Sequence, residues 1–215
     1  MIIPYDRKVV AMAEEELFSF IQGSKLQHYV SYMIDRNYRK SVKLKRWIKE
    51  QVDEPSQFLL NTVDEISDSP DHDTQMKYVF DWVKSKIKYV TDTKQFGNVE
   101  YWQEASKTAG GRQGDCEDGA ILMYVLARLK KVPANRMLLM CGSVTGGGHC
   151  WLAFKPYCYP LNFVFMDWCY WPSKASVAYR KKYAIVDKTI YNGGNYKSLW
   201  FAFNEEFACK GLKKR

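Results

Sequence analysis

Three residues of this sequence could together carry nucleophilic catalysis: Cys116, His149 and Asp167. Cys116 follows a glycine-containing turn, Gly111–Gly114, and opens an apolar stretch whose periodicity predicts a helix over Cys116–Lys131. A thiol at the start of a helix lies where backbone N–H groups and the positive end of the helix dipole favour a thiolate. We therefore predict that Cys116 is the nucleophile.

The acids beside this cysteine have a structural explanation of their own. Asp115, Glu117 and Asp118 suit the N-cap and first turn of a helix, where carboxylates accept backbone N–H groups. Their negative charge opposes a thiolate at the same place. We expect helix capping from them, and substrate contact is the alternative.

A base and an orienting acid are predicted on two neighbouring strands. His149 follows three glycines and opens an apolar strand, and Asp167 is the lone acid of a second apolar stretch. If the two face each other in an antiparallel hairpin, the register also pairs Pro156 with Pro160, which ends the ladder symmetrically. Directly opposed residues have Cβ atoms about 4.5–5.5 Å apart, so imidazole and carboxylate could meet.

The predicted roles follow from the chemistry of such a triad. His149 takes the thiol proton and later protonates a leaving amine, and Asp167 fixes the imidazole tautomer. The backbone N–H of Cys116 is one half of an oxyanion hole, and Trp102 or Gln103 is the candidate second donor. We expect no metal and no cofactor. In particular, His149 and Cys150 cannot easily share one metal, because adjacent strand residues point to opposite faces.

The predicted elements give an α+β fold, in which helices come first and antiparallel strands follow. The helices are expected over Ala11–Ile21, Gln27–Val52, a segment opened by Pro55–Ser56, and Thr74–Tyr89. The strands are expected over Met137–Val144, Cys150–Phe154, Phe163–Trp168 and Tyr183–Ile190. An irregular stretch, Thr91–Gly114, precedes the cysteine helix. The turn-rich segment near residue 70 divides a helical N-terminal region, 1–70, from a catalytic core with a C-terminal extension, 71–215.

These motifs resemble those of the transglutaminase-like superfamily. Gly114–Asp118 is similar to its nucleophile motif, His149–Trp151 to its His-x-Trp strand, and Asp167 to its acidic motif. The helix end at Trp82–Tyr89 is similar to the segment that leads into the core. The resemblance covers roughly Thr74–Trp171.

The resemblance implies a papain-like fold and amide chemistry through a Cys116 thioester, with the nucleophile helix packed on an antiparallel sheet. A chain of 215 residues fits a compact prokaryotic or phage-type member. One departure is that Asp167 is followed by Trp168–Pro172 where Asp-Pro is common. The resemblance leaves the acyl acceptor, water or an amine, open.

Composition and charge limit the classes of partner that this chain is expected to bind. The net charge of +8 is spread along the chain, with much of the excess in Arg36–Lys49 and Lys210–Arg215. This fits a solvated helix face and tail, and nucleic acid is the less favoured partner. No apolar run reaches the roughly 18 residues of a membrane span, and no secretory signal is recognised. We expect six free thiols and a cytoplasmic or virion-associated protein.

Three functions are compatible with these patterns. The first is a cysteine peptidase or amidase that acts on a protein or peptide, and the second is a protein-glutamine transamidase with the same triad. The third is a structural or binding component of a viral or surface assembly, with the N-terminal helices as the candidate surface for an assembly partner.

Overall fold

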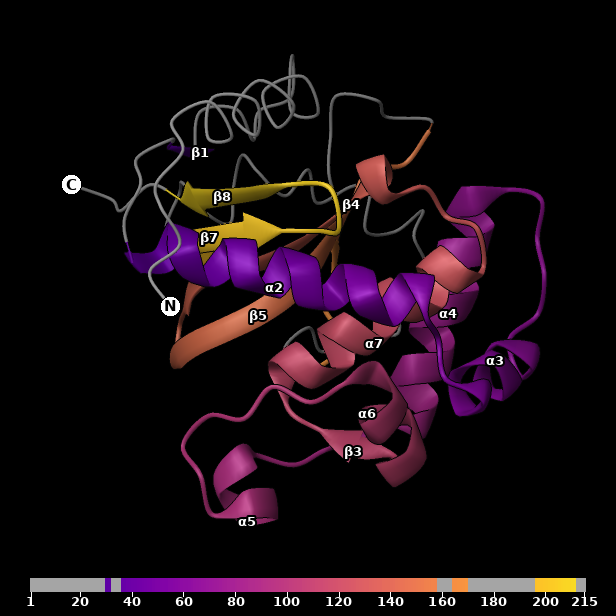
Figure 1. The fold of residues 1–215 in the computed structure, drawn as a ribbon, viewed down its shortest axis with the longest axis horizontal. Helices are drawn as coiled ribbons and strands as arrows, with labels where there is room; N and C mark the ends of the chain where they lie inside the picture. The colour runs from indigo at the N-terminus through magenta and orange to yellow at the C-terminus, as the bar shows by residue number, and fades with distance from the viewer. Residues whose placement is uncertain (1–29, 32–35, 158–163, 170–195, 212–215) are drawn as a thin grey trace.

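The structure is a computed structural model, and it describes residues 30–31, 36–157, 164–169 and 196–211. The predicted helix over Ala11–Ile21 and the predicted strand over Tyr183–Ile190 lie outside these residues. The described part of the chain combines helices with an antiparallel sheet, which confirms the α+β class (Figure 1).

The described helices are α2 (Arg36–Asp53), α3 (Gln57–Asp64), α4 (His72–Lys86), α5 (Asp92–Phe96), α6 (Ala105–Gly111), α7 (Cys116–Leu129) and the short 3₁₀ helix η2 (Ala134–Arg136). Ser56 caps α3 as its position before the apolar run predicts, with its hydroxyl 3.3 Å from the Leu59 N–H. The stretch 91–114 was expected to be irregular, and this was wrong because α5, α6 and a short strand lie within it. These elements are too short to show a periodicity.

One sheet has six strands in the order β1-β8-β7-β4-β5-β6, and all its neighbours are antiparallel. Its strands are β1 (Val30–Ser31), β4 (Met137–Val144), β5 (Gly147–Phe154), β6 (Val164–Met166), β7 (Tyr196–Phe203) and β8 (Ala208–Gly211). A separate parallel pair joins β2 (Lys88–Tyr89) to β3 (Gln113–Gly114), just before the cysteine helix. The sheet therefore continues through β7 and β8, which were not predicted from the sequence.

The predicted register of the hairpin is wrong by two residues. β5 pairs with β6 as Leu152 with Met166 and Phe154 with Val164, so Pro156 is not opposite Pro160 in the same register. Side chains alternate faces with a period of two, so a shift by two residues keeps every side chain on its face and leaves no trace in the hydrophobic pattern. Asp167 lies one residue beyond the end of β6 and outside the ladder.

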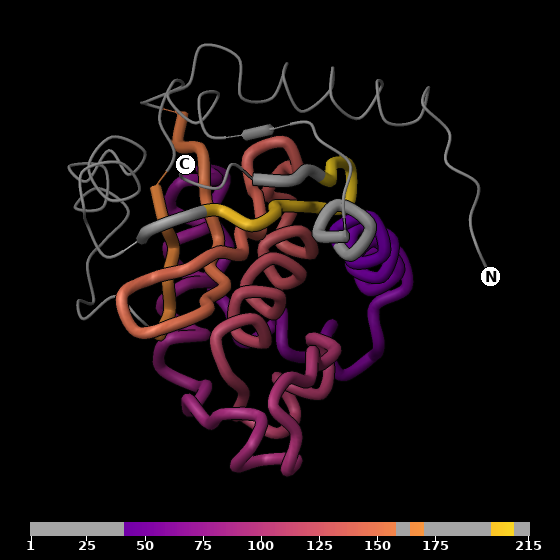
Figure 2. Tube along the Cα trace, turned by 90° about the vertical axis from the view of Figure 1, so that its left-hand side faces the viewer, coloured from indigo at the N-terminus to yellow at the C-terminus, as the bar shows by residue number. Residues whose placement is uncertain are grey.

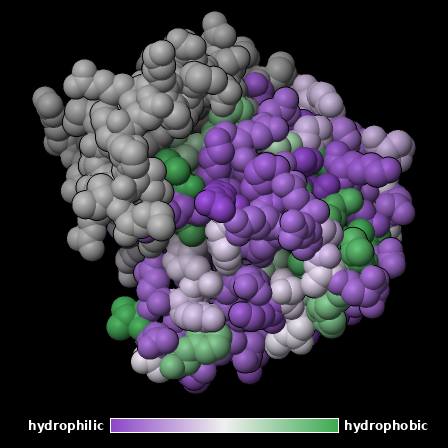
Figure 3. All heavy atoms as spheres, in the orientation of Figure 1, coloured by the Kyte–Doolittle hydropathy of each residue, from purple (hydrophilic) through white to green (hydrophobic). Residues whose placement is uncertain are grey.

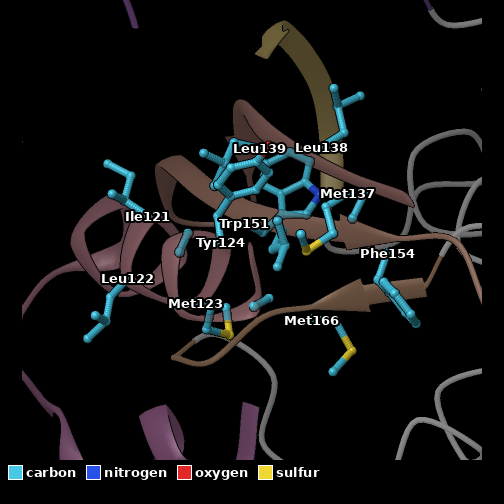
Figure 4. Packing of buried hydrophobic residues seen from close by; sticks show 14 of the residues in the cluster. Ile121, Leu122, Met123, Tyr124, Met137, Leu138, Leu139, Trp151, Phe154 and Met166 are labelled. Carbon is cyan, nitrogen blue, oxygen red and sulfur yellow. The ribbon is translucent and has the colours of Figure 1, made fainter. Parts of the chain in front are cut away.

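Helix α7 is the centre of the hydrophobic core. Its residues from Glu117 to Ala127 are all buried, because the helix is packed against β5, α4, α6 and α2 (Figures 1 and 2). Figure 4 shows Met123 and Tyr124 of this helix gathered with Met137 and Trp151 of the sheet. The element that begins with Cys116 is thus held on every side, which suits a site that needs fixed geometry.

Helix α2 covers β7 and β8 and also reaches α7. Its predicted apolar side is confirmed, since Ile48 is buried and Leu44, Trp47 and Val52 pack against the same core. Hydrophilic side chains cover much of the face that α2 presents in Figure 3. Among the described helices, none is both long and apolar enough to cross a membrane.

Candidate active site

Cys116 is the first residue of α7, and a capping box precedes it. Asp115 is the N-cap, and its backbone N–H donates to Asp118 Oδ2 at 3.2 Å. Asp115 and Asp118 therefore take the predicted cap positions, whereas Glu117, in the first turn, accepts the Cys116 thiol. Gly114 is needed at this turn, because a Cβ there would lie 2.6 Å from the Cβ of Asp118.

His149 and Asp167 form a buried pair. Nε2 of His149 lies 2.7 Å from Oδ2 of Asp167, and the two residues are 8% and 0% exposed. The Cys169 backbone N–H donates to Oδ1 of the same carboxylate at 3.3 Å, and the imidazole stacks on Trp151 with ring centroids 5.9 Å apart. The contact expected from the sequence is present, although Asp167 reaches it from the end of β6 rather than from a directly opposed position.

The strand that carries His149 also contacts the thiol. The backbone N–H of Cys150, the next residue along β5, lies near the Cys116 sulfur and acts to lower the pKa of the thiol. The thiol itself donates to Oε2 of Glu117 at 3.1 Å, and the Cys116 carbonyl accepts the indole N–H of Trp168 at 3.2 Å. The nucleophile candidate is therefore tied to β5 and to the segment after β6 at the same time.

The electrostatics at Cys116 oppose a thiolate. Burial, followed by the negative charges of Glu117 and Asp115, raises the pKa of the Cys116 thiol well above its ordinary value. The helix N-terminus was expected to favour the thiolate, but here desolvation and two nearby carboxylates outweigh the helix dipole.

Trp102 and Gln103 lie on the segment before α6 and both use their side-chain donors. The indole N–H of Trp102 donates to Oε1 of Glu100 at 2.8 Å, and its ring packs against aromatic side chains of β7. Gln103 donates to Asp118 from its backbone N–H at 2.9 Å and from its side-chain amide. Their role as oxyanion donors stays a prediction.

Three acids converge behind the start of α7: Asp92, Asp115 and Asp118. One carboxylate oxygen from each lies within 4.8 Å of the others. Burial raises the pKa of Asp92, and burial with the neighbouring acid Glu117 raises the pKa of Asp115 to about 9. Burial also raises the pKa of Asp118 to about 6. Sequence reasoning missed this cluster, because Asp92 comes from α5.

A second set of ligand-type atoms surrounds the histidine. His149, Asp167 and Cys169 each place one such atom within 4.8 Å of the others, and the Cys169 thiol lies 3.8 Å from Oδ1 of Asp167. Burial, with the charge of Asp167, raises the pKa of this thiol. Cys169 therefore acts as a neutral hydrogen-bond donor to the carboxylate.

Comparisons with known proteins agree with this fold. The sequence model of the Transglutaminase-like superfamily matches residues 60–167, which is half of the chain. Among solved structures, calcium-bound LapG of Legionella pneumophila has a similar fold, with a TM-score of 0.52 at 18% identity over 80% of this chain and 87% of that chain. EGTA-treated LapG of the same organism gives 0.50 at 19% identity over 80% and 87%.

No curated protein sequence matches this chain significantly. The likeness to the solved structures concerns the fold, whereas the superfamily match spans the cysteine helix, the histidine strand and Asp167. The chain belongs to the transglutaminase-like superfamily.

Proposed function

We propose that this protein is a cysteine peptidase or amidase that cleaves an amide bond of a protein or peptide through a thioester on Cys116. The observation that carries the proposal is the buried hydrogen bond between His149 and Asp167, next to Cys150, whose backbone N–H lies near the Cys116 sulfur. A purely structural or binding module has no need of a buried imidazole–carboxylate pair at this place, which makes the assembly role the weaker alternative.

In the proposed reaction each group has one role. Nε2 of His149 is engaged by Asp167, so Nδ1 is the nitrogen that takes the proton of Cys116. The sulfur attacks the carbonyl carbon, the carbon–nitrogen bond breaks, and Nδ1 returns the proton to the departing amine. The Cys116 backbone N–H, at the open start of α7, stabilises the oxyanion.

The thioester is then resolved by an acceptor. Water gives up a proton to His149, its oxygen bonds the acyl carbon, and the sulfur leaves to restore Cys116. A primary amine would complete a transamidation at the same acyl carbon with the same proton transfers. The mass of the product from a protein substrate separates the two outcomes, because hydrolysis adds water and transamidation adds the amine.

The test of the proposal is the rate of iodoacetamide labelling, read for each cysteine by mass spectrometry. The buffer contains excess CaCl₂ so that the cation site proposed below is filled. We expect Cys116 to react faster than the other thiols, and His149→Ala to remove that advantage. His72→Ala is the matched control, because His72 stacks on Tyr157 away from the pair and its loss should leave labelling of Cys116 unchanged. Equal labelling of Cys116 in wild type and in His149→Ala would refute the proposal.

We further infer that Asp92, Asp115 and Asp118 bind a divalent cation of the calcium type. Oδ1 of Asp92 and Oδ1 of Asp115 are buried and make no hydrogen bond within the described part of the chain. Asp92 is 2% exposed, so its carboxylate faces inward toward the other two acids. Ca²⁺ prefers such carboxylate oxygens, and the similar LapG fold is known in a calcium-bound form.

The cation would supply positive charge at the start of α7, where three acids and Glu117 gather. The chain's own contribution is to hold the acids in place: the Tyr101 backbone N–H donates to Asp92, and Gln103 donates to Asp118. Calorimetric titration of the EGTA-treated, desalted protein with CaCl₂ tests the inference, with MgCl₂ as the comparison. We expect a single calcium site, and absence of binding heat together with an unchanged melting temperature would contradict it.

A further inference from the structure

The residue after Asp167 is a tryptophan, and its side chain reaches Cys116. Trp168 is 3% exposed, and its indole N–H donates to the Cys116 carbonyl at 3.2 Å. Cys116 and Trp168 belong to different elements, one at the start of α7 and one beyond β6. This hydrogen bond therefore connects the start of α7 directly to the segment that carries Asp167.

Helix α7 is shaped to receive this indole. A Cβ at Gly119 would lie 2.2 Å from both Nε1 and Cε2 of Trp168, a distance at which something must move. Glycine inside a helix costs about 1 kcal/mol relative to alanine, so this position gives up helix stability. In return the indole ring approaches the helix backbone one turn from Cys116.

Two further contacts hold Trp168 in place. Nζ of Lys84, on α4, donates to the Trp168 carbonyl at 2.5 Å. The ring of Tyr89, on β2, lies against the indole with centroids 5.9 Å apart. Trp168 is thus fixed by three elements that precede it in the chain, and Asp167 is its covalent neighbour.

We propose that Trp168, seated on Gly119, is a positioning residue that sets the distance between the Cys116 thiol and the His149–Asp167 pair. The inference rests on the proposed function, because positioning matters only if these groups react together. The indole N–H fixes the Cys116 backbone, and the backbone of Trp168 fixes the adjacent carboxylate. A misplacement of about 1 Å in such a site can cost on the order of 10²-fold in rate.

The test isolates the N–H group from the bulk of the ring. Replacing Trp168 by 3-benzothienylalanine puts sulfur in place of the N–H at nearly constant shape. We expect the iodoacetamide rate at Cys116 to fall about tenfold or more, with the melting temperature of the whole protein little changed. A role confined to ring packing would leave this rate unaltered, and that result would overturn the proposal.

A double-mutant cycle tests the contact between the Trp168 indole and Gly119. Gly119→Ala should slow labelling of Cys116 because the new methyl group displaces the indole. Trp168→Phe should slow it because the donor is lost, and its smaller ring leaves room for the methyl group. If the two residues act through one contact, the double variant is no slower than the slower single variant. Rate losses that multiply in the double variant would show that the two substitutions act independently. That result would overturn the proposed contact between Trp168 and Gly119.

The controls separate this inference from the proposed function. If wild-type Cys116 reacts no faster than in His149→Ala, the proposed function itself fails. If wild-type Cys116 is fast and the benzothienylalanine protein is equally fast, only the positioning role of Trp168 fails.

Discussion

The two halves of the candidate site differ in how their charges are satisfied. On the strand side, the carboxyl group of Asp167 contacts Nε2 of His149 and accepts from the Cys169 backbone N–H, so each of its two buried oxygens has a hydrogen-bond partner. On the helix side, Asp92 and Asp115 each keep a buried oxygen without a hydrogen bond in the described part of the chain. Burial and mutual repulsion there raise the pKa of Asp115 to about 9.

The difference indicates what each half needs from outside the chain. The strand side already offsets its buried charge, so it can orient an imidazole without help. On the helix side, carboxylates lie around the Cys116 thiol and raise its pKa. Oδ1 of Asp92 and Oδ1 of Asp115 are buried there and have no hydrogen-bond partner in the described part of the chain. We infer that the strand half is preformed, whereas the helix half is completed by a bound cation.

The largest effect is expected from Asp167→Asn, which alters the His149–Asp167 pair on the strand side. An amide in place of the carboxylate no longer stabilises the imidazolium and can hold the wrong tautomer. Turnover of a protein or peptide substrate should fall about 10⁴-fold. The control is Cys169→Ser, which keeps a hydroxyl donor near the other oxygen of Asp167 and should retain activity. Comparable losses of turnover in both variants would mean that the contact between His149 and Asp167 has no specific role in the reaction.

The next effect concerns the helix side, where we propose the cation site. Asp92→Asn removes one of the three carboxylates and should abolish the calcium-dependent rise in melting temperature. A ligand present at about one hundred times its dissociation constant stabilises the folded state by about 2.7 kcal/mol, so the lost effect is large. Asp53→Asn, an exposed acid paired with Lys49 on α2, is the matched control and should keep the full calcium response. A normal response in Asp92→Asn would remove this residue from the site.

A smaller effect is expected from Glu117→Gln. Glu117 accepts the thiol hydrogen bond, and its charge raises the pKa of Cys116. Removing a negative charge stabilises the thiolate and lowers the thiol pKa, so at fixed neutral pH more thiolate is present. Labelling of Cys116 in EGTA should become roughly tenfold faster, a scale set by the strength of hydrogen bonds to charged groups. Slower labelling would show that Glu117 assists the thiol rather than opposing it.

The sequence predicted the elements whose patterns are long and regular. Helix α7 begins at Cys116 as expected, because an apolar stripe and an acidic first turn mark its start, and β4 has the predicted bounds. The contact between His149 and Asp167 was expected from a register that proved wrong, since a shift of two residues leaves the side-chain faces unchanged. The right contact was thus reached through incorrect pairing.

The features that sequence reasoning missed depend on segments far apart in the chain. Asp92 joins Asp115 and Asp118 only because the segment 88–90 runs beside residues 112–114 as a parallel pair. The raised pKa of Cys116 depends on its burial, which motif spacing does not report. The tryptophan after Asp167 looked like a departure from the common pattern, and in the structure its indole N–H donates to the Cys116 carbonyl.

The smallest effect is expected from Trp102→Phe, which tests a predicted oxyanion donor. The indole N–H of Trp102 is 2.8 Å from Oε1 of Glu100, and the ring packs on Phe201 and Phe203. Phenylalanine keeps the ring contacts, so hydrolysis of p-nitrophenyl acetate should stay within about twofold of wild type. Removing a true oxyanion donor costs about 10²–10³-fold in turnover. A loss of that size, with labelling of Cys116 unchanged, would mean that the indole turns from Glu100 toward the acyl oxygen during the reaction and that the helix half is completed by substrate as well as by a cation.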